Sequence, residues 1–433
     1  MTIETLSSKQ ALAFRKQNAQ STWPRPDNGV ERLLPIPLPR VSPKLKICKY
    51  DKVFCIGSCF AREIEKTLKR FGLSVAALKM EMPSDRGGQL SVDAFLNKYT
   101  VHSILSELTL ALEPKVIEPT RCLVEVSEGV FQDYQLAGSL LSASFDNMLT
   151  YRADFSREFS SVRDANIVII TLGLSEVWYD KVSDLYLNKA PDLKALRRHP
   201  DRFELRVLDY EETLKGLDNI HALLSRNLQS GFKILITVSP VPLISTFRAV
   251  DVFEANSYSK SVLRAATEAF SMRYGNVSYF PSYEMVTIGP QDVVWGGRGD
   301  FRHVNRDYVE IIILHALEAF LECPGEDLAI RKTEAMARVL LDANKPDAAL
   351  TVLNRVKGNT SSELSRTRKH AQSLLSGKGA LHGGQNSAFR SVEKWLASKM
   401  LQERHFKKYR TSRSAFFADS KHSLLRWWGA KTR

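Results

Sequence analysis

The sequence predicts an α/β protein built on a doubly wound parallel sheet, with a helical extension after it. Four apolar runs rich in β-branched residues have the length of strands, at 52–56, 167–172, 232–238 and 277–280. Unbroken apolar runs are typical of strands that are covered on both faces. Helical patterns separate them, and this alternation favours a parallel sheet whose functional loops gather at the carboxyl ends of the strands.

The first predicted strand leads into a sharp turn and a helix. Gly57-Ser58-Cys59 follows the strand at 52–56, and helical spacing begins directly afterwards, at 60–70. In α/β enzymes such a junction holds a nucleophile where the first N–H groups of a helix stabilise negative charge. Ser58 and Cys59 are therefore candidate nucleophiles; the alternative is an ordinary turn that contains a buried cysteine.

A second polar turn, Gly173-Leu174-Ser175-Glu176, directly follows the strand at 167–172. The carboxyl ends of parallel strands meet at one edge of a sheet, so we expect this turn to lie near the glycine turn after the first strand. Polar residues that precede the helix expected from residue 101 onward are candidates for the same cleft, or are caps of that helix.

A loop before the last helix of the α/β pattern contains Asp300 and, three residues later, His303. At this spacing the carboxylate reaches the imidazole and fixes its tautomer, which leaves the other ring nitrogen able to act as a base. The alternative is a solvated histidine beside an aspartate that caps the helix expected at 307–321. We expect His303 to come within hydrogen-bonding reach of Ser58 or Cys59 in a shared pocket.

Composition limits the class of protein. Hydrophobic residues make up 44% and charged residues 25% of the 433 residues, which are globular values, and no apolar run is long enough to cross a bilayer. The first residues are polar and show no secretory signal, so we expect a cytoplasmic protein.

Five cysteines occur, and none stands at a disulfide-framework or metal-ligand spacing. We therefore expect free thiols in a reducing compartment and neither a bound metal nor a cofactor. Only Cys59 lies in a turn where a reactive thiol would be useful.

Four segments follow from these patterns. Residues 1–45 are rich in proline and predict an extended arm, and residues 46–322 are the α/β domain. Residues 323–375 contain two short amphipathic helices that resemble one tetratricopeptide-type hairpin. Residues 376–433 form a tail rich in basic and aromatic residues.

The tail holds most of the charge. The chain has a net charge of +13, and residues 377–433 contain thirteen Lys and Arg against three acidic residues. Such a tail suits an anionic partner, with an anionic membrane surface as the candidate for peripheral binding; no specific nucleic-acid partner is predicted. The alternative is a solvated helix.

The order of the turns resembles the SGNH (GDSL-type) hydrolase superfamily, in which Gly-Asp-Ser, Gly-x-Asn-Asp and Asp-x-x-His motifs follow one another. The chain is similar in particular to the GSCFA-domain family, which we place in that superfamily. The resemblance covers roughly residues 46–320 and rests on five segments: GSCFA at 57–61, TLGLSEVW at 171–178, TVSPVPL at 237–243, SKSVLR at 259–264 and YFPSYE at 279–284.

The resemblance implies a three-layer, flavodoxin-like fold and a role for each matched residue. Aligned without gaps, Cys59 takes the place of the nucleophilic serine, and Ser58 becomes the nucleophile only if the turn is rotated by one residue. Ser175 takes the place of the oxyanion asparagine, whereas Asp300 and His303 match unchanged. The implied oxyanion or substrate-binding residues are Gly57, Gly173, Ser175 and Glu176.

The implied function is hydrolysis of an acyl ester, with an acylated carbohydrate or polysaccharide precursor as substrate. A cysteine at a helix N-terminus and near a histidine is expected to have a lowered pKa. One alternative is an O-acyltransferase that uses acyl-coenzyme A as co-substrate. The other is a non-catalytic binding protein on the same fold, which the replaced Asp and Asn positions favour.

Overall fold

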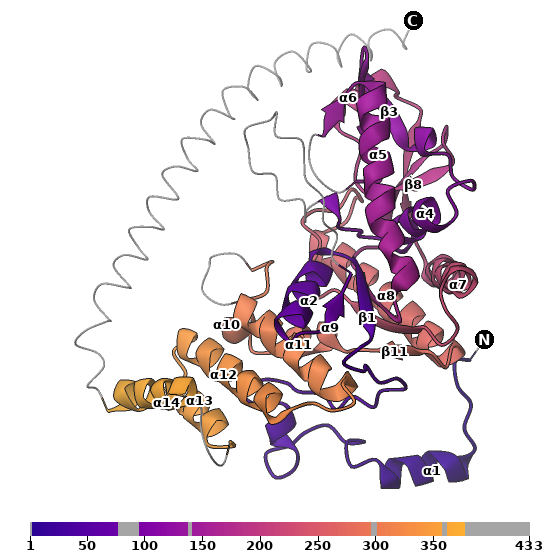
Figure 1. The fold of residues 1–433 in the computed structure, drawn as a ribbon. Coiled ribbons are helices and arrows are strands. Elements are labelled where there is room, and N and C mark those ends of the chain that lie inside the picture. Colours follow the sequence, from indigo (N-terminus) through magenta and orange to yellow (C-terminus); the bar gives the residue numbers. More distant parts are fainter. Residues whose placement is uncertain (1, 77–94, 137–140, 296–300, 357–361, 377–433) are drawn as a thin grey trace, which may run out of the picture. The chain divides into compact units, whose positions relative to one another are not determined.

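The structure is a computed structural model that describes residues 2–76, 95–136, 141–295, 301–356 and 362–376 (Figure 1). Residues 1–364 form one compact unit, and residues 365–433 are a second. The helix α14 (Ser362–Leu375) runs from the first unit into the second, and all other elements named below belong to the first.

A parallel sheet occupies the centre of the first unit, and its five strands in the described residues have the order β11-β10-β6-β1-β2. They are β1 (Lys52–Gly57), β2 (Ser74–Val75), β6 (Ile167–Leu172), β10 (Lys233–Val238) and β11 (Val277–Tyr279). The four predicted strands are confirmed; β2 has only two residues and was not predicted. In the register, Ile167 pairs with Val53 on one side and Lys233 on the other, so β6 lies at the centre.

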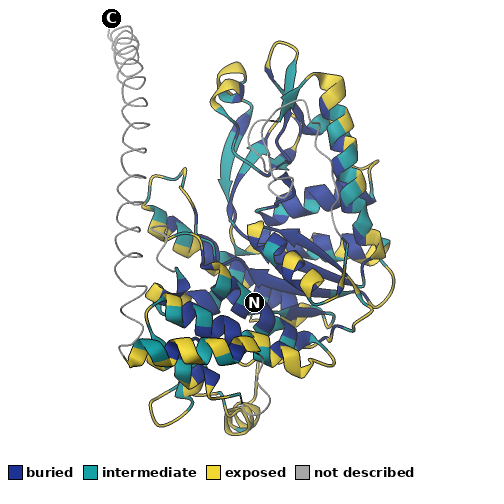
Figure 2. Cartoon of the chain, turned by 60° about the vertical axis from the view of Figure 1, so that its left-hand side comes forward, coloured by how far each residue is buried: buried dark blue, intermediate teal, exposed yellow. Residues whose placement is uncertain are grey.

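Helices cover both faces of this sheet. Alternate residues of β1 face opposite ways, and Cys55 contributes to one apolar core while Phe54 contributes to the other. The first core contains α2 (Cys59–Arg70), α9 (Ser282–Ile288), α10 (Gln291–Val294) and α11 (Arg306–Phe320). The second contains α4 (Val101–Leu112), α5 (Phe145–Phe159), α7 (Tyr210–Asn227) and α8 (Val252–Arg273). Figure 2 shows the buried strands between helices whose outer faces are exposed, which confirms the α/β class.

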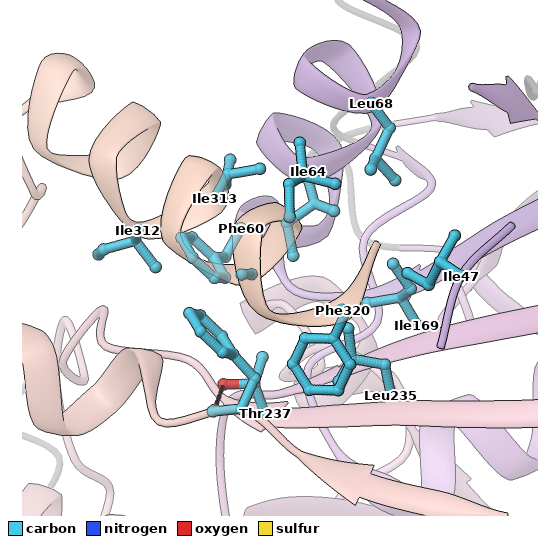
Figure 3. Close-up of a pocket in the computed structure, with 13 residues that line it drawn as sticks. Ile47, Phe60, Ile64, Leu68, Ile169, Leu235, Thr237, Ile312, Ile313 and Phe320 are labelled. Carbon is cyan, nitrogen blue, oxygen red and sulfur yellow. Dashed lines mark hydrogen bonds between the residues drawn. The ribbon is translucent and has the colours of Figure 1, made fainter. Parts of the chain in front are cut away.

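The core between α2, α11 and the sheet leaves a small gap of about 30 Å³. Figure 3 shows Phe60 and Ile64 of α2 opposite Ile313 of α11 across this gap, with the sheet beneath. Its walls are apolar except for Thr237, whose hydroxyl donates to the Phe280 carbonyl at 2.6 Å. A dry gap without free polar groups belongs to the packing of the core rather than to a reactive site.

Two antiparallel sheets, which the sequence did not predict, lie outside the central one. The first has the order β3-β4-β5 and the second β8-β7-β9. Their strands are β3 (Leu123–Ser127), β4 (Val130–Asp133), β5 (Ser142–Ala143), β7 (Glu176–Asp180), β8 (Leu185–Leu187) and β9 (Phe203–Val207), and α6 (Leu193–Arg198) precedes β9. Because β7 begins directly after the polar turn at 173–175, the second sheet stands beside the carboxyl end of β6.

The C-terminal helices of the first unit pack on the α/β domain. α12 (Glu326–Asp342) and α13 (Pro346–Leu353) form the expected hairpin, with Ala335 and Ala349 fully buried in the core that also contains α11. Small side chains let these helices approach closely.

The N-terminal segment is only partly extended, since it contains α1 (Ser8–Gln17). A capping box at Ser7 and Gln10 stabilises the start of this helix. The prediction of an extended arm rested on the prolines and did not take this local signal into account. Further along, Ile36 is buried in the core, and the Pro39 carbonyl accepts a hydrogen bond from His315 Nε2 at 2.8 Å.

Candidate functional site

A cleft of about 490 Å³ lies at the carboxyl ends of β1, β6 and β10. It brings together five residues that the sequence singled out, from three separate loops: Ser58, Cys59, Gly173, Glu176 and His303. The turn after β1 and the loop before α11 therefore line one pocket.

The glycine turn fixes which side chain enters the cleft. Gly57 has φ 138°, and a Cβ there would lie 2.2 Å from the carbonyl oxygen of Thr171, so only glycine fits. The Ser58 N–H donates to Thr171 Oγ1 at 2.9 Å, and Ser58 Oγ caps α2 by accepting from the Phe60 N–H at 3.4 Å. Ser58 is 3% exposed, whereas Cys59 is exposed to the cleft, so the turn presents the thiol and buries the hydroxyl.

The surroundings of Cys59 have opposing effects on the pKa of its thiol. Although Cys59 is exposed to the cleft, the surrounding protein atoms displace part of its water, and this desolvation raises the pKa of its thiol, while the positive charge of Arg302 and the N–H groups of Phe60 and Cys59 lower it. The loss of water has the largest effect, so the pKa of the Cys59 thiol is raised. The sequence had predicted the opposite, a lowered pKa at a helix N-terminus. A thiol in this cleft is mainly protonated at neutral pH, and it requires a base to become a nucleophile.

His303 is the candidate base, and one of its hydrogen bonds is with Arg302. The guanidinium Nη1–H of Arg302 donates to His303 Nε2 at 2.8 Å. Among the described residues, no hydrogen bond is found between the imidazole and the Cys59 thiol, although both line the same cleft. Asp300, predicted to orient the imidazole, lies outside the described residues.

The N–H groups of the turn after β6 are bound to protein acceptors. Those of Gly173 and Leu174 donate to the Tyr99 carbonyl at 3.0 and 2.9 Å, and that of Ser175 donates to Ser259 Oγ at 2.9 Å. Ser175 is fully buried and is not among the residues that line the cleft, and its hydroxyl has no hydrogen-bond partner among the described residues. In contrast, the Cys59 N–H donates to no other described residue.

Glu176 holds one wall of the cleft in place through hydrogen bonds. Its carboxylate accepts from Thr246 Oγ1 at 2.6 Å and from the Phe247 N–H at 3.2 Å. These contacts tie the segment after β10, and with it the Phe247 ring, to the start of β7. The predicted substrate-binding residue is thus engaged in positioning a wall of the cleft.

Lys260 of α8 was missed by sequence reasoning although it stands in one of the quoted motifs. Its buried ammonium donates to three carbonyls, those of Gly173, Ser239 and Val241, each at 2.8 Å. Burial lowers the pKa of Lys260 to about 7. The sequence did contain a signal for this role. Lys260 stands three residues before Leu263, which places it on the buried face of the helix, and a buried charge requires hydrogen-bond partners.

A buried ion network supports the other side of the glycine turn. Lys98 and Arg152 both pair with Glu107, and Arg152 also pairs with Asp133; all four side chains are fully buried. The Lys98 N–H donates to the Gly57 carbonyl at 2.7 Å. The network therefore anchors the segment that leads into α4 against the turn that carries Cys59.

The described residues show neither a metal-binding cluster nor a membrane-spanning helix. They contain no group of three or more His, Cys, Asp or Glu side chains arranged to hold a metal ion. None of their helices combines the length and the apolar character that crossing a membrane requires.

The fold and the cleft define an α/β protein with a cysteine-bearing turn at the carboxyl edge of a parallel sheet. The chain belongs to the GSCFA family, whose sequence profile matches residues 52–315. Searches of curated proteins and of solved structures found no match.

Proposed function

We propose that the protein is an acyl-ester hydrolase of the SGNH type, with Cys59 as nucleophile and His303 as base. The main observation in support is that Cys59 is the first residue of α2 and lines the same cleft as His303. Ser58 is the weaker candidate because its hydroxyl is buried and already caps the helix. An acylated carbohydrate, as implied by the family resemblance, is the first substrate to test.

The proposed reaction has two steps, acylation of the Cys59 thiol and hydrolysis of the resulting thioester. In the first, His303 takes the thiol proton, the sulfur attacks the acyl carbonyl carbon, and the ester C–O bond breaks as the alcohol leaves with that proton. In the second, His303 takes a proton from water, the hydroxide attacks the thioester carbonyl, and the C–S bond breaks to release the acid and return the thiol.

The negative charge that develops on the carbonyl oxygen needs donors at α2. The Cys59 N–H is the first N–H of this helix, and Arg302 adds a positive charge at the same place. N–H groups that open a helix stabilise an oxyanion, and loss of one such donor typically lowers turnover by about a hundredfold.

Transfer to a hydroxyl acceptor is the second candidate. Apolar side chains such as Val177 and Leu205 line the cleft, and a wall of this kind excludes water from the thioester once an acceptor is bound. With acyl-coenzyme A as donor, release of free thiol that requires an added glycan identifies transfer, whereas release without a glycan identifies hydrolysis.

The test is an intact mass measurement after exposure to an activated acyl ester such as p-nitrophenyl acetate. We expect one acyl adduct that maps to Cys59, is absent from Cys59→Ala, and forms more slowly in His303→Ala. Cys323→Ala is the matched control, because Cys323 is also an exposed cysteine. An adduct on Cys323 alone, or none at all, contradicts the proposal and favours a binding protein.

A further inference from the structure

The walls of the cleft are largely apolar although its floor carries the polar turns. One wall comes from β7 and β9 and a second from the segment after β10. Val177, Trp178 and Leu205 are apolar side chains of the first wall, and Leu243, Ile244 and Phe247 are apolar side chains of the second. A pocket for an acetyl group needs no such extent of apolar wall, because acetyl has one methyl group to bury.

The mouth of the cleft exposes large apolar side chains. Ile244 is 78% and Phe247 58% exposed, and both line the cleft. A second groove of about 360 Å³ adjoins it, with Phe253 and Phe301 in its wall, each at least 80% exposed. Large apolar side chains that gather in one exposed place usually mark a binding surface.

The two hollows are adjacent. Pro242, Leu243 and Arg302 line both of them. An extended apolar group that starts at Cys59 therefore has a covered path along the walls and a second apolar surface beyond the mouth. The shape suits a flexible chain attached to the carbonyl carbon.

We infer that the cleft binds the apolar chain of an acyl group, so that the substrate is an ester or thioester of a medium-length or long acyl chain rather than of acetate. The inference rests on the proposed function for the position of the carbonyl at Cys59. The binding of the chain itself depends only on the apolar walls.

The size of the effect follows from the burial of methylene groups. Each methylene that leaves water for an apolar wall tightens binding by about fourfold. Affinity therefore rises along a series of carboxylates from acetate to decanoate, and it stops rising when the chain has filled the covered part of the cleft.

The experiment is isothermal titration of the full chain with acetate, butyrate, hexanoate, octanoate and decanoate. We expect saturation at one site, with affinity rising about fourfold for each buried methylene. Ile244→Ser and Leu205→Asp weaken octanoate binding several-fold or more, because they remove an apolar wall. Val182→Ser is the control, since Val182 is 73% exposed and does not line the cleft.

A flat series, or octanoate binding that Ile244→Ser and Leu205→Asp leave unchanged in folded protein, overturns the inference. Circular dichroism of each variant establishes folding, and Ile244→Ser alters an exposed side chain that the fold does not need. Rates of Cys59 acylation by p-nitrophenyl acetate and octanoate separate the two proposals. Chain-dependent binding without acylation of Cys59 refutes only the hydrolase, whereas equal acylation rates with a flat binding series refute only the chain site.

Discussion

Replacement of Lys260 by methionine tests whether one buried side chain fixes the loops of the cleft. The ammonium donates to the carbonyls of Gly173, after β6, and of Ser239 and Val241, after β10, each at 2.8 Å. Methionine keeps the approximate length of the side chain and has no donor. The buried carbonyls of Gly173 and Ser239 and the partly buried carbonyl of Val241 then lose this partner.

A buried carbonyl left without a partner costs about 1 kcal/mol or more. At pH 10 Lys260 is a neutral amine with two N–H donors in the folded protein, and little of the cost of deprotonation remains, so Lys260→Met is expected to lower the free energy of unfolding at this pH by about 2 kcal/mol, as measured by urea denaturation followed by circular dichroism. Lys215→Met is the matched control, because Lys215 is an exposed lysine of a neighbouring helix, α7. Equal stability of the two variants refutes the role assigned to Lys260.

The same variant gives a pH test with a defined sign. Burial lowers the pKa of Lys260 to about 7 in the folded protein, against about 10.4 in an unfolded chain. Between these values the unfolded chain binds the extra proton, so the free energy of unfolding rises with pH by at most about 1.4 kcal/mol per unit. The gap between the wild type and Lys260→Met should widen from pH 7 to pH 10, and a constant gap contradicts the lowered pKa.

Two further predictions concern the turn and its charge. Gly57→Ala should lower the free energy of unfolding by more than about 3 kcal/mol or prevent folding, because its Cβ would lie 2.2 Å from a carbonyl oxygen of β6; Gly275→Ala, which has open space around it, should be tolerated. Arg302→Met should raise the pKa of the Cys59 thiol, since it removes the charge that lowers it; the pH dependence of Cys59 alkylation by iodoacetamide measures this shift, with the exposed Arg306→Met as control. An alkylation profile that Arg302→Met leaves unmoved would show that the charge does not act on the thiol.

The central sheet was predictable because its strands are covered on both faces. A strand of this kind is buried at every position and apolar at nearly all of them, as in the run at 167–172, where only Thr171 is polar, and the pattern needs no knowledge of its neighbours. The antiparallel strands were not predicted because their burial is partial and irregular; β9 has one buried residue followed by four half-buried ones. Two-residue strands such as β2 carry no periodicity at all.

The site was predictable in its location and less so in its contacts. Polar turns at the ends of parallel strands must meet at one edge, and this rule placed Cys59 near the turn at 173–176. His303 was assigned to the same pocket by the Asp-x-x-His spacing and the family resemblance, and it lines that cleft. The pattern at residues 173–176 does not show where each N–H points. That depends on Tyr99 and Ser259, which reach the turn from other parts of the chain and take its donors.

The N–H groups of the turn after β6 already donate to protein acceptors, which limits where the oxyanion donors of the proposed reaction can lie. If the oxyanion donors do not come from this turn, they come from the first turn of α2, where Cys59 also stands. Nucleophile and oxyanion donor then belong to one rigid element, and Gly57 and Ser58 set the position of both together. A change that shifts the start of α2 should therefore lower the rate of acyl transfer more than it weakens binding of the acyl chain, because the chain is held by walls from β7, β9 and the segment after β10.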